Sequence, residues 1–350
     1  MTPEFWRKRR VLLTGHTGFK GAWASAMLSA LGAQVFGLSL APESDPNLWA
    51  GFGGRLGIDE ATIDLRDAAA VREACLRAKP QIVLHMAAQA QVRQGYLDPL
   101  GTFDTNAMGT ANLLDALRDL PDVETILVVT SDKVYRNEGK GEAFGEARPL
   151  GGSDPYSASK VAAEAVVQAY ADSYFTPKSV PLATARGGNV VGGGDFSSDR
   201  LIPDIFRAVN ARKAVELRYP KARRPWQHVL DCLSGYFLYI EHLDRHRSGE
   251  PRSLNFGPAP GSDLTVAEIA EAMARHLGSN QHWQPAAGSA PPEKQTLMLD
   301  NSLAKATLGW SPKLDIDDTI AWTAEWYAAF AKGAQPLELV QTQIERHRAR

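Results

Sequence analysis

The chain has 350 residues, which exceeds the usual size of a single hydrophobic core and indicates one large α/β unit with an appended lobe. Its 38 basic and 40 acidic residues give a net charge of −2, which excludes the strongly basic surface typical of proteins that bind nucleic acids or anionic membranes. The two cysteines, Cys75 and Cys232, match no metal-binding spacing and are expected to be free buried thiols in a reducing compartment.

We expect no export signal at the start of the given sequence. The basic residues Arg7–Arg10 precede an apolar run that stops at Thr14, well short of the apolar core of a signal peptide. No later stretch is apolar for long enough to cross a bilayer. We therefore expect a soluble, cytoplasmic protein that has neither nucleic acid nor membrane as a partner.

Strand-like and helix-like segments alternate through the first half of the chain. The predicted strands are Val11–Thr14, Gln34–Leu40, Ala61–Ile63, Ile82–His85 and Thr125–Thr130, and the predicted helices are Ala22–Leu31, Ala68–Ala78 and Thr105–Arg118. Gly32 follows the first of these helices as a cap. Such alternation predicts the α/β class, with a Rossmann-like doubly wound parallel sheet.

The pattern loosens in the second half of the chain. Short strands are predicted at Leu182–Ala185 and Ser253–Phe256, and helices at Pro203–Ala211, Cys232–Leu243, Val266–Leu277 and Ile316–Phe330. We interpret the proline-containing segment Ser279–Lys294 as an exposed connection and the basic tail Arg346–Arg350 as a solvated end. We expect residues 1–180 to form the Rossmann domain that carries the catalytic residues. Residues 181–350 should form mainly a smaller α/β lobe for the substrate, with some segments returning to the Rossmann domain.

A glycine-rich turn links the first strand to the first helix. Gly15, Gly18 and Gly21 follow the spacing G-x-x-G-x-x-G, a variant of the dinucleotide-binding fingerprint. Glycines permit a tight turn and a close approach of the backbone to a pyrophosphate, which then faces the positive end of the helix. The residues expected against the cofactor are therefore Gly15, His16, Thr17, Gly18, Phe19, Lys20 and Gly21.

The end of the second strand lacks the acidic residue that NAD-binding folds usually carry there. Residues 38–42 contain neither an acid for the ribose nor an arginine for a 2′-phosphate, so NAD rather than NADP is a hypothesis at this point. Asp64, which is followed by Leu65, comes after the third strand and is expected near the adenine. The alternative role, an N-cap for the helix that follows, suits Asp67 better.

The end of the fourth strand offers small residues to the cofactor. Ala87, Ala88 and Gln89 lie just beyond it, and small side chains allow close approach. His85 ends the same strand, and we interpret it as a hydrogen-bonded structural histidine rather than a ligand.

Two groups of polar residues indicate chemistry beside the cofactor. Ser131, Asp132 and Lys133 follow the apolar fifth strand, whose carboxyl end should deliver side chains into the ligand crevice. Tyr156 and Lys160 are four residues apart and share one face of a helix. A phenol, with a pKa near ~10, is a poor base at neutral pH unless nearby positive charge favours the phenolate, and Lys160 and an oxidised nicotinamide would both supply that charge. The alternatives are a solvated strand end and an ordinary surface pair.

The glycine turn, the Tyr156/Lys160 pair and the alternating architecture resemble the extended short-chain dehydrogenase/reductase family. In that family a hydroxyl residue completes a catalytic triad, and Ser131 occupies its place. In the sugar-nucleotide 4,6-dehydratases of the family two further catalytic residues follow, and Asp132-Lys133 resembles the CDP-glucose 4,6-dehydratases rather than the Asp-Glu of thymidine- and GDP-linked enzymes. Stretches spread over most of the chain resemble the same group: GHTGFKGAW (15–23), HMAAQAQVR (85–93), TSDKVY (130–135), LGGSDPYSASK (150–160), ARGGNVVGGGD (185–195), DRLIPD (199–204) and RPWQHVLD (224–231).

The chain departs from that group at a few positions. Ala90 and Gln91 stand where other residues are common, and Phe144 in the loop 136–148 stands where a tyrosine is expected. Because this loop follows the strand that ends at the polar triplet, the fine preference for substrate stays open.

The resemblance implies NAD-dependent dehydration of CDP-D-glucose to CDP-4-keto-6-deoxy-D-glucose. Tyr156 would take the proton of the C4 hydroxyl while hydride leaves C4 for NAD⁺, with Ser131 bonded to the same oxygen. Lys160 would hold the phenolate and the nicotinamide ribose. Asp132 is expected to protonate the departing C6 hydroxyl, and Lys133 either removes the C5 proton or positions the sugar. Hydride would then return to C6 and regenerate the cofactor.

Contacts with the substrate are expected from the second half of the chain. Asn189 resembles a residue that contacts the nucleotide, and Arg224 and His228 resemble residues that contact the diphosphate and the base. Arg200 is a further candidate, because the paired donors of arginine suit a diphosphate.

Three other functions fit parts of the sequence. A sugar-nucleotide 4-epimerase shares the Tyr, Lys and hydroxyl set but does not need Asp132-Lys133, and a 4,6-dehydratase for another nucleotide sugar needs all of them. A non-catalytic NAD-sensing protein would typically lose Tyr156 or Lys160, and both are present. The resemblance also implies a homo-oligomer, a dimer or tetramer, and a place in deoxysugar formation for surface polysaccharide.

Overall fold

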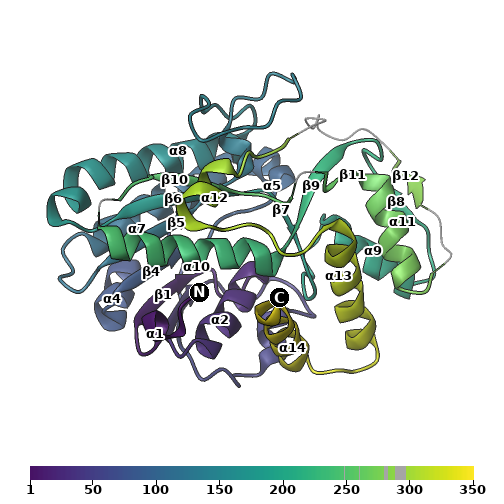
Figure 1. Cartoon of the computed structure of the whole chain (residues 1–350), viewed down its shortest axis with the longest axis horizontal. Coiled ribbons are helices and arrows are strands. Elements are labelled where there is room, and N and C mark those ends of the chain that lie inside the picture. Colours follow the sequence, from purple (N-terminus) through teal and green to yellow (C-terminus); the bar gives the residue numbers. More distant parts are fainter. Residues whose placement is uncertain (248, 260, 280–282, 288–296) are drawn as a thin grey trace.

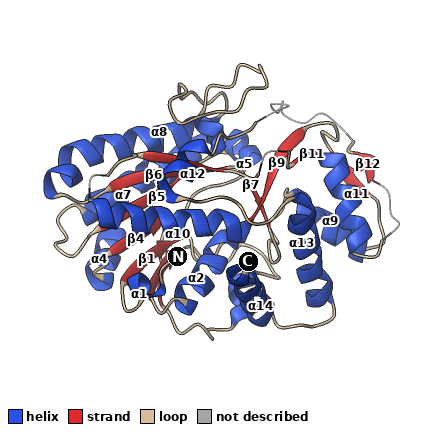
Figure 2. Ribbon diagram, in the orientation of Figure 1, coloured by secondary structure: helices blue, strands red, loops and turns tan. Residues whose placement is uncertain are grey.

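Seven parallel strands form the central sheet of the molecule (Figures 1 and 2). In the order β10-β6-β5-β4-β1-β2-β3 they comprise β10 (Ser253–Phe256), β6 (Leu182–Gly187), β5 (Thr125–Val129), β4 (Ile82–His85), β1 (Arg10–Thr14), β2 (Gln34–Ser39) and β3 (Asp59–Thr62). The structure is a computed structural model that describes residues 1–247, 249–259, 261–279, 283–287 and 297–350. The strand order reverses beside β1, and ligands bind at the carboxyl ends of the strands at such a switch point.

Helices cover both faces of this sheet, and the alternation of side chains along each strand explains why. In β1, Leu12 belongs to one buried apolar cluster, whereas Val11 and Leu13 belong to the other. The cluster around Leu12 is covered by α4 (Ala68–Ala78), α7 (Gly109–Leu117) and α8 (Pro155–Tyr170), and the opposite cluster by α1 (Pro3–Trp6), α2 (Phe19–Ala30), α10 (Val229–His246) and α12 (Ser302–Leu308). The predicted doubly wound α/β fold is confirmed.

Short helical turns fill the connections of the main sheet. They comprise α3 (Leu48–Phe52), α5 (Val92–Leu97), α6 (Pro99–Phe103), a π-helical turn at Asp104–Met108, a 3₁₀ turn at Asp132–Val134, a second π-helical turn at Ala171–Phe175 and a 3₁₀ turn at Thr176–Lys178. The segment predicted as one helix over Thr105–Arg118 is therefore a π-helical turn followed by α7.

The remaining elements form a second lobe at the carboxyl end of the sheet, seen on the right of Figure 1. It contains a sheet of β7 (Asn189–Val191), β9 (Arg223–His228) and β11 (Asp263–Thr265), the pair β8 (Val215–Leu217) and β12 (Trp283–Pro285), and the helices α9 (Leu201–Asn210), α11 (Val266–His276) and α13 (Ile316–Ala331). The last helix, α14 (Pro336–Ala349), packs against α2 and α13. Among the helices of the described residues, none is long and apolar enough to cross a membrane.

Most predicted elements are confirmed, and the start of α2, the C-terminal tail and the segment 279–294 are corrected. The bounds of α4, β4 and β10 agree with the sequence, and α2 begins three residues earlier than predicted, at Phe19, because the glycine turn already ends at Gly18. The tail Arg346–Arg350 is not simply a solvated end, since it lies at the end of α14 and buries His347. In the segment predicted as an exposed connection, residues 283–285 form β12, and residues 280–282 and 288–294 lie outside the described residues.

Candidate active site

A large cavity lies at the carboxyl ends of the central strands and extends to the second lobe. Its volume is about 2630 Å³, which exceeds that of a typical small-ligand pocket and leaves room for a dinucleotide together with a second nucleotide. Its wall comes from the glycine turn, the ends of β4 and β5, the first turn of α8, and β7, α9 and β9 of the second lobe. The cavity thus joins the segments that the sequence singled out.

The glycine turn has the close packing that its spacing predicts. Gly15 has a φ of 77°, and a Cβ there would lie 2.8 Å from the nitrogen of Ala87. A Cβ on Gly21 would lie 1.9 Å from the carbonyl oxygen of Gly15, so α2 can begin at this turn only with glycine at both positions. Gly18 is the N-cap of α2, which directs the free N–H groups of its first turn toward the cavity. The turn residues in the wall are Gly15, Thr17, Gly18, Phe19, Lys20 and Gly21.

His16, the remaining residue of this turn, is not in the wall of the cavity. Its ring is buried against Gly37, where a Cβ would lie 2.6 Å from the ring, and its Nε2 bonds to Glu60 Oε2 at 2.7 Å. Burial lowers the pKa of His16, and Glu60 opposes this effect. The prediction of a cofactor contact is corrected, because the ring braces the turn against β2 and β3 instead.

Asp64 and Leu65 lie in the wall beyond β3. The guanidinium of Arg66 donates hydrogen bonds to both carboxylate oxygens of Asp64, and these bonds lower the pKa of that carboxyl. Asp67 accepts a hydrogen bond from the nitrogen of Ala70 and caps α4, as predicted. The two acids therefore have separate places, and only Asp64 faces the cavity.

At the end of β4, His85 is a structural residue, as interpreted from the sequence. Its Nδ1 lies 2.6 Å from Thr14 Oγ1 and its Nε2 lies 3.1 Å from Thr110 Oγ1. Burial, followed by the charge of Lys160, lowers the pKa of His85 to about 3, so the ring is neutral. The residues beyond it in the wall are Ala87, Ala88 and Gln89.

The polar triplet at the end of β5 faces the cavity. Ser131 Oγ donates to Asp132 Oδ1 at 3.0 Å and accepts from the nitrogen of Lys133 at 3.2 Å, and Lys133 Nζ lies 3.4 Å from the same carboxylate oxygen. Asp132 is 1% exposed, and its Oδ2 has no hydrogen-bond partner among the described residues. Buried polar groups are nearly always hydrogen-bonded, so a carboxyl oxygen left without a partner at a cavity wall indicates a chemical role.

The first turn of α8 brings a phenol and an amine to this triplet. Asp154 caps the helix by accepting from the nitrogen of Ser157 at 2.9 Å, and Tyr156 lies in the cavity wall. Lys160 lies beneath the wall rather than in it, because its Nζ donates a hydrogen bond of 3.3 Å to the carbonyl oxygen of Val129. Burial and then the nearby charge of Lys20 lower the pKa of Lys160 to about 7.

Lys20 adds a second amine to this end of the cavity. It lies in the wall with its Nζ 5.8 Å from the ring centre of Tyr236. Burial lowers the pKa of Lys20, with opposing effects from Cys232 and Asp132. Within the described part of the chain the amine has no hydrogen-bond acceptor and no ion-pair partner, so its donors are left for a ligand.

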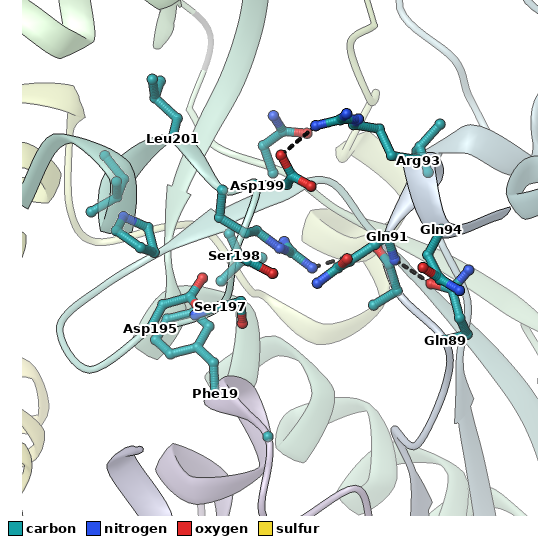
Figure 3. Close-up of a pocket in the computed structure, with 18 of the residues that line it drawn as sticks. Phe19, Gln89, Gln91, Arg93, Gln94, Asp195, Ser197, Ser198, Asp199 and Leu201 are labelled. Atoms are coloured by element: carbon teal, nitrogen blue, oxygen red, sulfur yellow. Dashed lines mark hydrogen bonds and ion pairs between the residues drawn. The ribbon is translucent and has the colours of Figure 1, made fainter. Parts of the chain in front are cut away.

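Charged residues of the two lobes meet across the cavity (Figure 3). Arg93 Nη1 lies 2.5 Å from Asp199 Oδ1, and Arg200 Nη2 donates to the carbonyl oxygen of Ala90 at 3.5 Å. Figure 3 places Gln89 and Gln91 on the Rossmann side and Ser197 and Ser198 opposite them. The predicted substrate residues found in this wall are Asn189, Arg200 and Arg224.

His228, predicted to contact the substrate, does not line the cavity. It is fully buried, its Nδ1 accepts from the nitrogen of Leu230 to cap α10, and its ring packs edge-on against Trp23 and Trp322. Burial lowers the pKa of His228 to about 3. The correction has a simple cause: β9 turns into α10 at this residue, and a residue at a helix start inside the core serves as a cap.

Sequence reasoning missed a buried ion pair next to the site. Glu164 of α8 binds Arg186 of β6 through two hydrogen bonds of 2.9 Å, and Arg186 also donates to the hydroxyl of Tyr135. The spacing of four residues between Lys160 and Glu164 is a usable signal, because it places both side chains on the same helix face. Among the described residues no group of three or more His, Cys, Asp or Glu is arranged to hold a metal ion.

Comparisons with known proteins all find similarity to epimerases and dehydratases that act on nucleotide sugars. Residues 11–257 match the model of the NAD dependent epimerase/dehydratase family. The chain is 38% identical to the CDP-glucose 4,6-dehydratase of Salmonella typhimurium, over 95% of this chain and 94% of that protein. A crystal structure of UDP-glucose-4-epimerase from Stenotrophomonas maltophila with bound NAD superimposes with a TM-score of 0.80 at 25% identity, covering 93% and 100% of the two chains. The NAD complex of dTDP-glucose 4,6-dehydratase from Bacillus anthracis, at 22% identity, has the same fold, with a TM-score of 0.78 and coverage of 94% and 99%.

Proposed function

The chain belongs to the NAD dependent epimerase/dehydratase family, and we propose that it converts CDP-D-glucose to CDP-4-keto-6-deoxy-D-glucose with loss of water. One observation carries the proposal: Asp132 is buried beside Lys133 and directly follows Ser131. All three residues line the same cavity as Tyr156. A 4-epimerase needs a base and a hydroxyl but no acid–base pair for elimination. The likeness to a CDP-glucose 4,6-dehydratase over nearly the whole chain supports the reaction and the nucleotide.

The residues around the glycine turn fit NAD. A Cβ on Gly15 or Gly21 would fill the space that the turn needs to reach Ala87 and the start of α2, and the helix N-terminus at Gly18 suits a pyrophosphate. The residues that would hold the cofactor are Gly15, Thr17, Gly18, Phe19, Lys20, Gly21, Asp64, Leu65, Ala87, Ala88 and Gln89. NAD bound there supplies the acceptor for hydride from C4 of the sugar and later the donor of hydride to C6.

Oxidation at C4 falls to the groups at the ends of β5 and α8. Tyr156 accepts the proton of the C4 hydroxyl as the C4–H bond breaks, which is general base catalysis. Ser131 donates a hydrogen bond to the same oxygen, and for this its hydroxyl turns away from Asp132. Lys160, four residues after Tyr156 on the same face of α8, carries positive charge on part of the molecules at pH 7, which stabilises negative charge on the phenol oxygen.

Elimination falls to the two residues that follow Ser131. The C4 ketone acidifies the C5–H bond, and Lys133 as a neutral amine removes this proton. Asp132 in its protonated form gives a proton to the C6 oxygen, which leaves as water. Lys133 then returns its proton to C5, Tyr156 releases its proton to solvent and Asp132 regains one. The sum is the loss of one water molecule with no net change in protons.

The second lobe is proposed to bind the nucleotide part of the substrate. Arg200 and Arg224 lie in the wall of the cavity and carry the paired donors that suit a diphosphate, and Asn189 offers an amide to the nucleotide. The Arg93–Asp199 ion pair joins the lobes at this place.

Nuclear magnetic resonance of CDP-glucose, incubated with the purified protein and NAD in deuterated water, tests the proposal. We expect a new C6 methyl signal and deuterium at C5. A C4 epimer without a methyl signal would show an epimerase, and turnover of another nucleotide sugar in place of CDP-glucose would overturn the substrate.

We also propose that the protein forms a homodimer. Apolar side chains are exposed over α5, α6 and the π-helical turn after them: Leu97 at 78%, Leu100 at 82%, Phe103 at 37% and Met108 at 54%. The adjoining α8 exposes the small residues Ala165 and Ala169. An exposed apolar surface of this kind beside a surface of small residues suits a second copy of the same helices.

A further inference from the structure

Glu164 is the centre of a buried network beside the catalytic groups. Tyr156, Lys160 and Glu164 follow one another at intervals of four residues, so one face of α8 carries all three toward the sheet. Both oxygens of Glu164 are fully bonded: Oε1 accepts from Thr130 Oγ1 at 2.6 Å and from Arg186 Nε at 2.9 Å, and Oε2 accepts from Thr184 Oγ1 at 3.0 Å and from Arg186 Nη2 at 2.9 Å. The network thus ties α8 to the ends of β5 and β6.

Arg186 extends the network to the other side of the catalytic triplet. Its Nη1 donates to the hydroxyl of Tyr135 at 2.9 Å and to the carbonyl oxygen of Glu146 at 3.3 Å. Tyr135 in turn donates to Asn255 Oδ1 at 2.7 Å. Thr130 directly precedes the triplet 131–133, and Tyr135 follows it after one residue. The triplet is therefore held at both ends by the same ion pair.

We propose that the Glu164–Arg186 pair is a positioning device that sets the distance between the groups on α8 and the groups at the end of β5. The inference rests on the proposed function, in which Tyr156 and Ser131 must reach one sugar oxygen while Asp132 and Lys133 reach the next carbons. A bidentate pair fixes orientation as well as distance. Since well-packed apolar residues can replace a buried ion pair without loss of stability, a positioning role explains its presence better than a stabilising role.

The test separates position from stability by comparing single and double variants. Glu164→Gln leaves Arg186 charged and buried, so we expect both the melting temperature and kcat to fall. In the double variant Glu164→Gln/Arg186→Met neither charge remains, so the melting temperature should recover. We expect kcat to stay on the order of 10- to 100-fold below wild type, because small misplacements of reacting groups have effects of this size.

The KM for CDP-glucose and the Kd for NAD of the double variant should stay within about twofold of the wild-type values, since the binding groups are elsewhere. Should Glu164→Gln fail to fold, Thr184→Val, which removes one of the four hydrogen bonds, takes its place, with an expected loss of a few-fold in kcat.

Crystal structures of the double variant and the wild-type protein complete the test without substrate. We expect the Tyr156 and Ser131 hydroxyls to lie at a changed distance while α8 stays formed. Arg252→Met, which removes a surface ion pair with Asp172, is the matched control and should leave kcat unchanged. Recovery of kcat together with the melting temperature, or an unchanged hydroxyl distance, would overturn the proposal. Failure of the wild-type protein to convert CDP-glucose would overturn the proposed function instead, and the crystal structures would still decide the positioning role.

Discussion

In the proposed mechanism, Asp132 and Lys133 are the residues that distinguish dehydration from epimerisation. Asp132 Oδ2 is buried in the cavity wall without a partner among the described residues, and Lys133 Nζ lies close to the other oxygen. We predict that Asp132→Asn and Lys133→Met each lower the rate of methyl formation by about 100-fold or more, because each removes one half of the elimination step.

Oxidation at C4 should survive in the same two variants. With elimination blocked, the absorbance of the reduced cofactor should rise on addition of CDP-glucose and then persist. Lys305→Met, at an exposed lysine of α12, is the control and should behave as wild type. Variants that still form the methyl group at the wild-type rate would exclude Asp132 and Lys133 from the elimination.

We expect Lys160 to destabilise the folded protein. Burial, followed by the charge of Lys20, lowers its pKa from 10.5 to about 7, so at neutral pH the chain must fold either with a buried charge or with loss of a proton. We predict that Lys160→Met raises the free energy of unfolding at pH 7 by up to about 4–5 kcal/mol, because the pKa shift is about 3.5 units at about 1.4 kcal/mol for each unit, while activity is lost.

The gain from Lys160→Met should depend on pH in one direction. Below pH 7 both the folded and the unfolded lysine hold a proton, so the penalty is complete. Between the folded pKa of about 7 and the unfolded value of 10.5 the unfolded lysine keeps a proton that the folded one has lost, so the penalty shrinks as pH rises. Urea unfolding of both proteins at a series of pH values measures this, and a gain that grows with pH would contradict the assignment.

Individual residues were predictable where the backbone dictates them. The glycine spacing predicted the turn, and the polar triplet at a strand end predicted a segment that lies in the cavity wall. His16 and His228 were assigned to ligands because they stand inside motifs, yet both rings lie away from the cavity, one against Glu60 and one as the cap of α10. Spacing does not tell on which side of a turn a side chain lies, because that depends on neighbours such as Gly37, which are distant in sequence.

At the scale of elements, α14 and its anchor are the part that the sequence did not predict. Asp231 in α10 is buried, and its carboxylate accepts from the backbone nitrogens of Lys313 and Leu314 at 2.9 and 3.0 Å and bonds to His347 Nε2 at 2.8 Å. His347 is 116 residues away in sequence, so the periodicity of the tail alone could not identify its partner. The strands and α4 were predictable because their apolar pattern is local.

We predict that Asp231→Ala destabilises the protein by roughly 3 kcal/mol or more, because it leaves two backbone N–H groups and the buried ring of His347 without their partner. Asp317→Ala, at an exposed residue in the first turn of α13, is the matched control and should change the free energy of unfolding by about 0.5 kcal/mol or less. Denaturation in urea provides both values. Equal effects of the two changes would mean that Asp231 does not anchor the C-terminal segment.

At the scale of the whole molecule, both lobes line the large cavity, and a separate apolar surface is left exposed. We predict that Leu100→Glu, at the most exposed of the large apolar side chains, converts the proposed homodimer to a monomer, because it places a charge in the middle of the contact. Light scattering after size-exclusion chromatography measures the mass. A variant of unchanged mass, or a wild-type protein that is already monomeric, would contradict the proposed dimer.

The doubly wound architecture and the place of the cavity at the carboxyl ends of the strands were predictable from the alternation of elements and from the motifs. The dimensions of the cavity and the Arg93–Asp199 contact between the lobes were not, because they depend on how β7, α9 and β9 meet the Rossmann domain. The two residues of this ion pair are more than a hundred residues apart, so no local sequence pattern predicts their contact.

The fate of the hydrogen on C4 tests the central claim most directly, namely that oxidation, elimination and reduction occur at one site on one bound cofactor. CDP-glucose carrying deuterium at C4 would be converted by the protein in ordinary water, and the product examined by nuclear magnetic resonance and mass spectrometry. The account predicts one deuterium in the C6 methyl group of the product. Two results would contradict the account. One is a sugar that keeps deuterium at C4 and has no methyl group, and the other is a product that has a methyl group without deuterium.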